Sequence, residues 1–579
     1  MVAPLYTTDS GLLFHAGKIL VITIGLPARG KTHISRSLER YLRWMGVKTQ
    51  VVSLGDYRRK TLGGAQKLPA DYFHLGEKSP ETIALRKKVS DGCEQQIWDF
   101  FKTGQVVIYD ANNGTRAARQ SLAERFHSKG IHVIMLESVC DNKEIIEANI
   151  RSVKISSPDY RGWDPDKAVE DYYTRIRDHE EYYDPVEEKD WPYIRIFNVG
   201  ERIMVNNIKG YLQSRIVFFL MNIHNRPRTI YFARSGQSLI EHSYKADSDL
   251  SPAGWEYADK LKDFVLERRA KNLAQRGLGM GDQRLVIWTS TRRRAHHTAW
   301  PFLQAAASIS SSNLVTPADS HLATPGNATP VSSISGISPS ISAAMLRPHT
   351  PHVSHPLHTF HIDSIDGRLT APNSRALAPA LGSSGNTPSN LITPIPSTPN
   401  GLNIKVIEKP QMSEINPGIW DGLTPDQARK YYPQDWERFV KDPYAFRAPR
   451  AESYHDLSVR IEPLLIELER EKEDLLIIGH ASVIRCLLAY LIGLPASEIP
   501  AIEIARGDLL EVVPASYGVH CHAYHFWDGP GRRGDENIPV TEKDANNFYE
   551  NYAEDTKGKR TESVVIREPE ASLSVLETA

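Results

Sequence analysis

Residues 25–32 have the composition and spacing of a phosphate-binding loop. They read Gly-Leu-Pro-Ala-Arg-Gly-Lys-Thr and fit the pattern G-x-x-x-x-G-K-[ST]. The glycines let the backbone fold around a triphosphate, Lys31 would neutralise charge on the outer phosphates, and the Thr32 hydroxyl would ligate Mg²⁺. An apolar run at 19–24 precedes the loop and a helical pattern follows it. This strand, loop and helix context predicts a nucleoside triphosphate site with Mg²⁺.

The loop alone fits a GTPase switch, an ATPase motor or a small-molecule kinase. The next chemical signal is Asp110, which ends the apolar run 105–109. A carboxylate there would hold Mg²⁺ or accept a hydroxyl proton during in-line phosphoryl transfer, although a turn-forming Asp is the structural alternative. Cationic side chains in the loops after the strands would suit a second, anionic substrate, although each taken singly fits a surface charge. These are Arg58, Arg86, Arg116, Arg119, Lys154 and Arg175.

The elements that must position these residues alternate in type. Short β-rich runs between residues 18 and 198 are separated by helical patterns, which predicts a parallel sheet with helices on both faces. A helix is expected over 202–222, and Pro227 then marks a domain boundary. A second α/β series follows. The runs of the first series are 19–24, 50–54, 106–109, 133–136 and 194–197, and those of the second are 229–233, 285–288, 474–478 and the apolar helix 481–492.

A long segment at 305–402 interrupts the second series. It is rich in Ser, Pro, Thr, Ala and His, has few charges and shows no apolar period, so it is predicted to be a disordered insertion. It holds Thr-Pro and Ser-Pro pairs that suit proline-directed protein kinases, with a spacer of drifting composition as the alternative. The pairs begin at Thr316, Thr324, Thr329, Ser338, Thr350, Thr387, Thr393 and Thr398.

Composition narrows the function classes. The 579 residues predict two domains, and 69 basic against 70 acidic residues give no basic excess for nucleic acid or an anionic membrane. The four cysteines form no metal-type pair and suit a reducing compartment. No apolar run approaches the roughly 20 residues of a membrane helix. We therefore expect a soluble cytoplasmic protein with an N-terminal extension, 1–17, and a polar tail, 541–579.

Several longer strings resemble the bifunctional 6-phosphofructo-2-kinase/fructose-2,6-bisphosphatase family. The resemblance runs from Leu20 to Trp527 and implies a P-loop kinase domain at 18–226 and a histidine-phosphatase domain, similar to phosphoglycerate mutase, at 227–540. Its most specific strings are Gly25-Leu-Pro-Ala-Arg-Gly-Lys-Thr32, Asp56-Tyr-Arg-Arg59, Glu137-Ser-Val-Cys-Asp141, Val153-Lys-Ile-Ser-Ser-Pro-Asp-Tyr160 and Gln213-Ser-Arg-Ile-Val-Phe-Phe-Leu-Met-Asn-Ile-His224.

The resemblance implies roles for the kinase residues. Asp110 and Lys31 would be catalytic, with Cys140 beside them, and Asn149 would line the nucleotide site. Asn112, His179 and Ala118 depart from the family, which has Thr, Tyr and Arg there, and whether Arg116 or Arg119 replaces that Arg is left open. The ATP cradle would be Gly25, Leu26, Pro27, Ala28, Arg29, Gly30, Lys31, Thr32 and His33, and fructose 6-phosphate would be held by Arg58, Arg86, Lys154 and Arg175.

The phosphatase half differs from the family pattern at the position of the nucleophile. The family string Arg-His-Gly-Glu, whose histidine is transiently phosphorylated, stands here as Arg234-Ser235-Gly236-Gln237. A serine hydroxyl needs an adjacent base to become a nucleophile, whereas imidazole does not. The resemblance implies that the rest of the pocket is kept: Arg234 and Arg294 as phosphate ligands, Glu414 as general acid, His480 as second histidine, and Tyr432, Arg447 and Arg450 as sugar-phosphate contacts.

The leading expectation is a kinase that makes fructose 2,6-bisphosphate from ATP and fructose 6-phosphate, controls glycolysis, and carries an inactive phosphatase half. The alternatives are a bifunctional enzyme that uses Ser235 with His480 as its base, a non-catalytic nucleotide-binding module, and a kinase for another polyol phosphate. The family resemblance also implies a homodimer.

Overall fold

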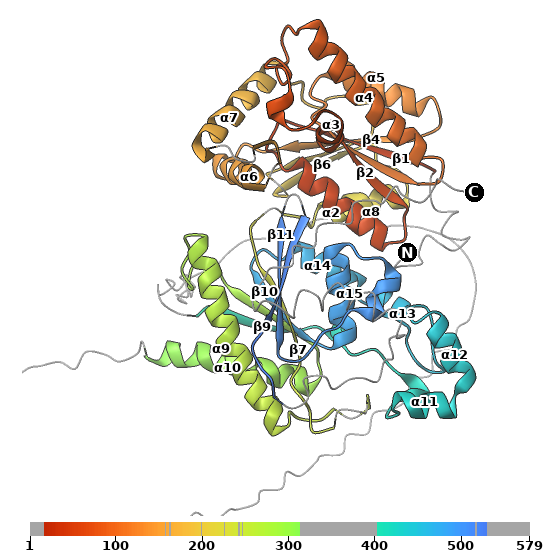
Figure 1. The fold of residues 1–579 in the computed structure, drawn as a ribbon, viewed down its shortest axis with the longest axis vertical. Coiled ribbons are helices and arrows are strands. Elements are labelled where there is room, and N and C mark those ends of the chain that lie inside the picture. Colours follow the sequence, from red (N-terminus) through yellow and green to blue (C-terminus); the bar gives the residue numbers. More distant parts are fainter. Residues whose placement is uncertain are drawn as a thin grey trace, which may run out of the picture. The chain divides into compact units, whose positions relative to one another are not determined.

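The computed structural model describes residues 17–529 apart from 157, 161–163, 199, 225, 241–243, 246, 313–401 and 516–517. Two six-stranded sheets with helices follow one another along the chain (Figure 1). The fold class predicted from the sequence is confirmed. The predicted N-terminal extension, apart from Gly17, and the predicted tail lie outside the described residues.

The first sheet has the strand order β2-β3-β1-β4-β5-β6. Its first five strands are parallel and β6 is antiparallel to β5. Since the phosphate-binding loop follows the central β1, it lies at the carboxyl edge of the sheet, where parallel α/β sheets bind ligands. The strands are β1 (Ile19–Ile24), β2 (Thr49–Ser53), β3 (Val106–Asp110), β4 (His132–Val139), β5 (Tyr193–Phe197) and β6 (Arg202–Asn206).

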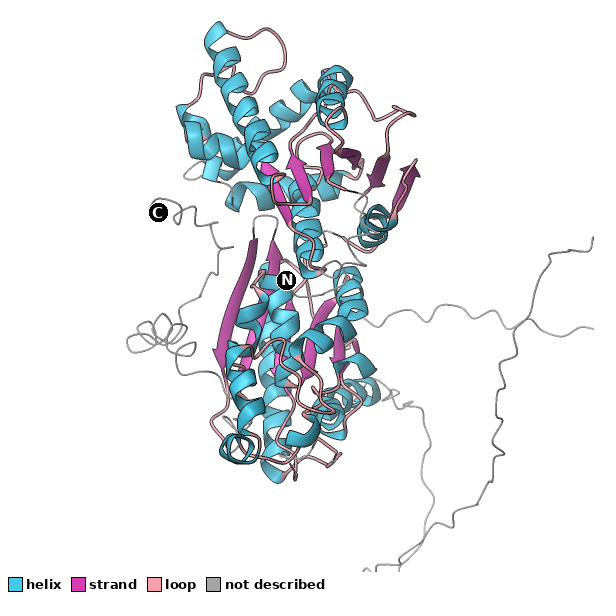
Figure 2. Ribbon diagram, turned by 90° about the vertical axis from the view of Figure 1, so that its right-hand side faces the viewer, coloured by secondary structure: helices cyan, strands magenta, loops and turns pink. Residues whose placement is uncertain are grey.

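Helices cover both faces of this sheet (Figure 2). Leu38 of α2 and Ile216 of α8 pack on one face, and Ile97 of α4 and Phe126 of α5 pack on the other. Burial on both faces explains why the strands are nearly continuous apolar runs. The helices are α2 (Lys31–Trp44), α3 (Leu54–Leu62), α4 (Pro80–Phe100), α5 (Arg116–His127), α6 (Lys143–Ser156), α7 (Pro165–Glu181) and α8 (Tyr211–Leu220), with the 3-10 helices η2 (Ala65–Lys67) and η3 (Pro158–Tyr160).

The predicted helix over 202–222 is wrong in its first part. Residues 202–206 form strand β6, and α8 begins only at Tyr211. The hairpin between β5 and β6 bends at Asn198 and Gly200, whose φ angles are 46° and 100°. Left-handed backbone at Asn and Gly is a turn signal, and it explains why the chain folds back as an antiparallel strand before the helix starts.

The second sheet has the order β12-β11-β7-β10-β8-β9, with β7, β10, β8 and β9 parallel. The antiparallel β11 and β12 complete the edge beside β7. Central β7 and β10 are fully buried, as their apolar runs predict. The strands are β7 (Ile230–Arg234), β8 (Leu285–Thr289), β9 (Ile404–Glu408), β10 (Asp474–Gly479), β11 (Asp508–Ala515) and β12 (Gly518–His525).

Helices also cover both faces of the second sheet. Leu261 of α9 and Phe302 of α10 pack on one face, and Leu464 of α14 and Leu487 of α15 pack on the other. The helices are α9 (Pro252–Gln275), α10 (Arg293–Ser312), α11 (Pro425–Tyr431), α12 (Pro433–Lys441), α13 (Tyr454–Arg460), α14 (Glu462–Arg470) and α15 (Ala481–Ile492), with η4 (Pro410–Met412), η5 (Gly418–Trp420) and η6 (Ala496–Ala501).

The predicted insertion is bounded by α10 and β9. Helix α10 continues to Ser312, so residues 305–312 are helical rather than part of an irregular segment. The chain is described again before β9, which pairs with β8 as an edge strand. The rest of the predicted insertion up to residue 401, with every Thr-Pro and Ser-Pro pair, lies outside the described residues.

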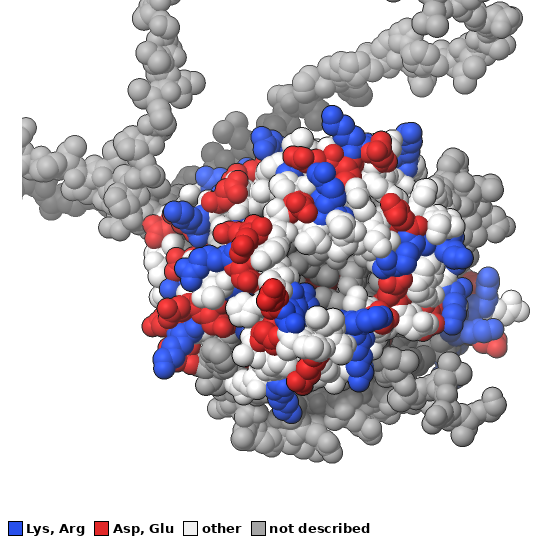
Figure 3. Space-filling model, turned by 90° about the horizontal axis from the view of Figure 1, so that it is seen from above, with Lys and Arg blue, Asp and Glu red and all other residues white. Residues whose placement is uncertain are grey.

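The surface shows charges of both signs. On the face drawn in Figure 3, Lys and Arg side chains are interspersed with Asp and Glu. Within the part of the chain that the structure describes, no helix has the length and apolarity needed to cross a bilayer.

Candidate active sites

The phosphate-binding loop connects β1 to α2 through two glycines with positive φ. Gly25 has a φ of 145°, and a Cβ there would come within 2.6 Å of the Ser138 carbonyl oxygen. Gly30 caps α2 at a φ of 79°. The backbone N–H of Gly25 donates to the Asn112 carbonyl at 3.0 Å, which ties the loop to the end of β3. The glycines of the motif are therefore required by the backbone, as their pattern predicts.

The predicted catalytic side chains meet at the N-terminus of α2. Thr32 Oγ1 donates to Asp110 Oδ2 at 2.9 Å, and Lys31 Nζ donates to the Leu26 carbonyl at 2.6 Å. Burial lowers the pKa of Lys31 to about 8, partly offset by Asp110, and burial raises the pKa of Asp110. A hydroxyl and a carboxylate in contact are oxygen ligands of the kind that Mg²⁺ prefers, so Thr32 and Asp110 fit that ion.

Other residues of the predicted nucleotide site lie around the same loop. Asn149 Nδ2 donates to the Ala28 carbonyl at 2.9 Å, and Ala28 packs against the apolar cluster that includes Cys140. Arg29 donates to the Pro27 carbonyl at 3.2 Å. These contacts bring Cys140 and Asn149 to the loop from β4 and α6.

Two further residues of the predicted site, Cys140 and His33, are largely shielded from solvent, and their roles stay predictions. Burial raises the pKa of the Cys140 thiol, which keeps the group neutral at physiological pH. His33 Nε2 hydrogen-bonds the His224 carbonyl at 3.0 Å, and burial lowers its pKa. This bond ties the start of α2 to the segment that follows α8.

Three of the predicted sugar-phosphate arginines gather around residues 72–74. The guanidinium carbons of Arg58 and Arg175 lie 5.4 and 3.8 Å from the Phe73 ring centroid. Arg86 donates to the Tyr72 and His74 carbonyls at 3.3 and 3.0 Å. The sheet topology thus brings together cations from α3, α4 and α7. The backbone of Lys154 belongs to α6, but its side chain lies outside the described residues.

His179 lies on the same helix as Arg175. Its Nδ1 bonds to the Arg175 carbonyl at 2.7 Å. Burial is the main cause that lowers its pKa, and the charges of Lys31 and Arg86 lower it further. The ring is therefore neutral, and it lies within electrostatic reach of both the phosphate-binding loop and the arginine group.

Arg119, a predicted substrate contact, is surrounded by acceptors of the protein itself. Its side chain is fully buried, and its Nε donates to Glu188 at 2.6 Å. Its terminal nitrogens donate to the carbonyls of Gly114, Asp184 and Pro185. Arg116 is half exposed and lies 3.5 Å from Glu187. The guanidinium of Arg119 thus donates to four residues of the protein, and Arg116 is the more accessible of the two arginines between which the sequence left the choice open.

The second candidate site lies where β7 and β10 end. The Ser235 N–H donates to the Gly479 carbonyl at 2.9 Å, and Arg506 Nε donates to the Ser235 carbonyl at 3.0 Å. Arg234 donates to the Ile504 carbonyl at 3.2 Å. The next residue after Gly479 is His480, so the parallel pairing of the two strands places Ser235 and His480 at the same edge.

Both ring nitrogens of His480 have partners. Arg294 donates to Nδ1 at 2.9 Å, and Nε2 lies 3.0 Å from Ser290 Oγ. Since guanidinium only donates, Nδ1 accepts and the Nε2 proton points to Ser290. Glu414 lies 3.7 Å from Arg294 and 3.6 Å from His480, and it accepts from Ser482 Oγ. Arg294, Glu414 and His480, which are one predicted phosphate ligand, the predicted general acid and the predicted second histidine, therefore form one cluster.

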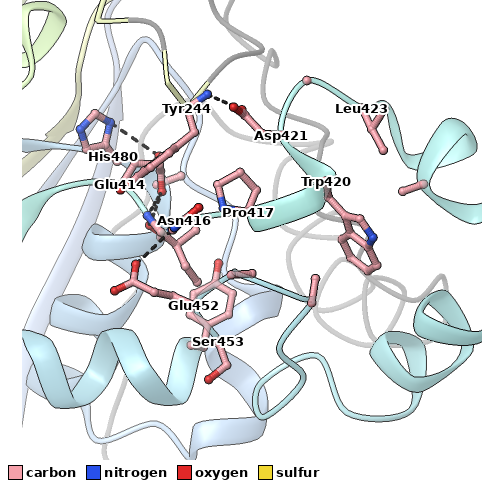
Figure 4. Close-up of a pocket in the computed structure, with 18 of the residues that line it drawn as sticks. Tyr244, Glu414, Asn416, Pro417, Trp420, Asp421, Leu423, Glu452, Ser453 and His480 are labelled. Atoms are coloured by element: carbon pink, nitrogen blue, oxygen red, sulfur yellow. Dashed lines mark hydrogen bonds and ion pairs between the residues drawn. The ribbon is translucent and has the colours of Figure 1, made fainter. Parts of the chain in front are cut away.

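This cluster opens into a cavity of about 190 Å³ (Figure 4). Arg294, Glu414 and His480 line it, and Trp420 and Phe446 form part of an apolar wall. Three of the predicted sugar-phosphate contacts are not among the described residues that line this cavity. They are Tyr432, Arg447 and Arg450. Arg447 instead pairs with Asp456 at 2.5 Å.

Sequence reasoning missed several residues that the structure brings into the sites. Ser482 lies two residues after His480, and Ser290 follows shortly after the apolar run 285–288, so the neighbouring sequence carried a signal for both. Asp159 lies in the string 153–160 that resembles the family, whereas Phe73 and Arg506 had no signal because their partners lie far away in the chain.

A phosphate-binding loop with a facing carboxylate, followed by a second α/β domain with a histidine and arginine cluster, defines a two-domain enzyme of phosphoryl-group chemistry. The family model of 6-phosphofructo-2-kinase matches residues 6–227, and that of the histidine phosphatase superfamily (branch 1) matches residues 397–526. The chain belongs to the 6-phosphofructo-2-kinase/fructose-2,6-bisphosphatase family. Its enzyme class is 6-phosphofructo-2-kinase, a class that uses ATP.

Named relatives support this membership along most of the chain. A Saccharomyces cerevisiae protein named "Putative 6-phosphofructo-2-kinase/fructose-2,6-bisphosphatase" is 32% identical over 543 residues, 91% of this chain and 86% of that one. Saccharomyces cerevisiae fructose-2,6-bisphosphatase is 28% identical over 508 residues, 86% and 87% of the two chains. The 6-phosphofructo-2-kinase/fructose-2,6-bisphosphatase of Gallus gallus is 28% identical over 506 residues, 86% and 83%.

Proposed function

We propose that the chain transfers the γ-phosphoryl group of ATP to the 2-hydroxyl of fructose 6-phosphate, giving fructose 2,6-bisphosphate and so controlling glycolysis. The contact of Thr32 with Asp110 beside Lys31 is the observation that carries this proposal. It unites a phosphate cradle, a charge-balancing lysine and a carboxylate, which are the parts that in-line phosphoryl transfer uses.

Each residue has a proposed task. Thr32 and Asp110 would hold Mg²⁺, which would offset charge on the phosphates. Lys31 would bind the outer phosphates, and the raised pKa of Asp110 makes this carboxylate a better acceptor for the proton of the attacking hydroxyl. Asn149 and Cys140 would line the nucleotide site, and Arg58, Arg86 and Arg175 would bind the sugar phosphate, with Lys154, Asn112 and Arg116 as further proposed contacts.

We propose that the phosphatase half is inactive because Ser235 stands at the position of the nucleophile. The pocket would still bind a phosphate group through Arg294 and His480. The alternative, a bifunctional enzyme, requires His480 to act as the base that activates the Ser235 hydroxyl. The contact of Nε2 with Ser290 and of Nδ1 with Arg294 argues against it, because both ring nitrogens already have other partners.

The test is an assay of purified protein with Mg-ATP and fructose 6-phosphate. We expect fructose 2,6-bisphosphate, loss of product in Lys31→Ala, and normal product in Lys102→Ala, which removes an exposed lysine. Product that survives Lys31→Ala would contradict the proposal. ATP binding without product would favour the regulatory-module reading, and turnover of a different sugar phosphate would favour the alternative-substrate reading.

The same protein tests the phosphatase half. We expect no release of phosphate from fructose 2,6-bisphosphate. If hydrolysis occurs and Ser235→Ala abolishes it, the bifunctional reading is correct. Hydrolysis that is unchanged in Ser235→Ala would overturn both accounts of that residue.

The domain bounds, the location, the assembly and the modification of the protein are also proposed from the sequence. We propose domains at 18–226 and 227–540, a cytoplasmic location, a homodimer, and protein kinases that act on the segment between α10 and β9. Light scattering of the purified chain tests the dimer, and mass spectrometry of the protein from its native cells tests the modifications.

A further inference from the structure

Two arginines from distant elements converge on one aromatic ring. Arg58 belongs to α3 and Arg175 to α7, and both guanidinium groups lie within 5.4 Å of the Phe73 ring centroid. Arg58 is almost fully buried. Two like charges close together repel each other, and burial strengthens that repulsion. The arrangement therefore needs groups that hold the cations in place.

Phe73 is the first of these groups. Its π-face attracts the guanidinium of Arg175, which lies at 3.8 Å, and contributes more weakly to Arg58 at 5.4 Å. Arginine stacks on aromatic rings because its guanidinium is planar and weakly hydrated. An aromatic ring in contact with both guanidinium groups favours a fixed orientation of each.

Carboxylates hold the other edges of both guanidinium groups. Asp159 accepts from both terminal nitrogens of Arg58, at 2.9 and 2.5 Å. Arg175 Nε lies 3.0 Å from Asp171. Tyr160, the neighbour of Asp159, donates to Asp171 at 2.7 Å, so the two carboxylates are linked through adjacent residues.

Asp159 also joins this group to the phosphate-binding loop. It accepts from Arg59 at 3.1 Å, Arg59 pairs with Asp56, and Asp56 pairs with Arg36 of α2 at 2.8 Å. Helix α2 begins directly after the loop. A continuous series of ion pairs thus runs from the nucleotide side to Arg58, which fixes the distance between the two substrates' sites.

We infer that Phe73 and Asp159 are positioning residues that hold the guanidinium groups of Arg58 and Arg175 in the orientation in which both bind the phosphate of fructose 6-phosphate. This rests on the proposed function. A fixed orientation lowers the ordering cost of binding, so it acts on substrate affinity more than on the chemical step.

The test separates the KM for fructose 6-phosphate from kcat and from the KM for ATP. We expect Phe73→Leu and Asp159→Asn each to raise the KM for fructose 6-phosphate about fivefold or more, with smaller changes in the other two constants. Phe73→Tyr keeps the ring and should restore the wild-type KM. The matched control is Glu147→Gln, which removes an exposed carboxylate from α6.

The outcomes are distinct. Equal KM values for Phe73→Leu, Phe73→Tyr and wild type would overturn the role of the ring, and a wild-type KM in Asp159→Asn would overturn the role of the carboxylate. A parallel rise in all constants together with a lower Tm would show a merely structural cluster and overturn the inference. Should Phe73→Leu fail to fold, Phe73→Met gives the same comparison with a longer side chain.

One further variant distinguishes this inference from the proposed function. If Arg58→Ala leaves the KM for fructose 6-phosphate unchanged, the substrate assignment itself fails. If Arg58→Ala raises that KM while Phe73→Leu and Asp159→Asn do not, only the positioning inference fails.

Discussion

At the scale of single residues, the nucleotide side is built around the contact of Thr32 with Asp110, next to the buried Lys31. The contact of Thr32 with Asp110 follows from two strands that end at one edge, and each strand was visible as an apolar run. The environment of Arg119 could not be predicted from the sequence, because its partner Glu188 lies 69 residues away and only the tertiary structure brings the two together. The site roles as a whole remain predictions.

Lys31 should make ATP binding depend on pH. Its pKa of about 8 means that the free enzyme loses this positive charge as the pH rises from 7 to 9. Neutral Lys31 attracts the phosphates less, so we expect the Kd for ATP to rise by up to about tenfold over that range. Titration calorimetry at several pH values measures it. In Lys31→Arg, whose side chain stays charged, the rise should disappear, and a pH-independent Kd in the wild type would contradict the assignment.

The serine at position 235 should be the reason why the phosphatase half does not hydrolyse fructose 2,6-bisphosphate. Because Arg294, Glu414 and His480 already form a cluster, Ser235→His would supply the missing imidazole nucleophile. We expect hydrolysis of fructose 2,6-bisphosphate to increase at least about tenfold over the wild type. Phosphate release measures it, with Ser235→Ala as the control. No gain in a folded Ser235→His protein would show that more than this one group is missing.

At the scale of elements, the sequence predicted the central parallel strands. The prediction failed for an edge strand that forms only by pairing with the strand beside it. The apolar runs of β1, β3, β7 and β10 are buried on both faces, so their composition identified them. Strand β6 is partly exposed, and its antiparallel pairing with β5 is what makes this segment a strand. A short segment at a sheet edge carries little apolar pattern, and it was predicted as helix.

The Arg119 and Glu188 pair should anchor α5 to the segment before β5. Removing one partner leaves a buried charge, so Arg119→Met should lower the free energy of unfolding by about 3 kcal/mol. Burial alone would raise the pKa of Glu188, but the bond from Arg119 outweighs it and the pKa is lowered. This stabilisation is present above the unfolded-state pKa and is lost as the pH falls through the folded-state pKa.

Urea unfolding at neutral and acidic pH measures this effect. The difference between wild type and Arg119→Met should shrink at acidic pH, and the KM for fructose 6-phosphate should change little in the folded variant. A large rise in that KM with unchanged stability would instead restore the substrate role that the sequence suggested.

At the scale of the whole molecule, residues of α2 pack with the second domain. Trp44 belongs to the core cluster of α14 and α15 and lies edge-on to Tyr490, with 5.7 Å between ring centroids. Arg40 donates to Glu469 at 2.8 Å, and Tyr490 donates to the same carboxylate at 2.7 Å. The helix that begins at the phosphate-binding loop thus ends among residues of the phosphatase-like half.

Trp44 should therefore couple the unfolding of the two domains. Trp44→Ala removes a large buried ring, at a cost of about 3–5 kcal/mol, and should split one calorimetric transition into two. Trp300→Ala, which removes an exposed ring from α10, is the control and should leave the transition single. A single transition in Trp44→Ala would show that the coupling lies elsewhere.

The pairing of β9 with β8 has a consequence for how this polypeptide can be divided. Strand β9 pairs with β8 in parallel register over five positions, from Leu285 with Ile404 to Thr289 with Glu408. The hydrogen bonds between the strands, rather than the connection, hold β9 in place. Two separately expressed fragments, one ending after α10 and the other starting before β9, should therefore assemble into one complete second sheet.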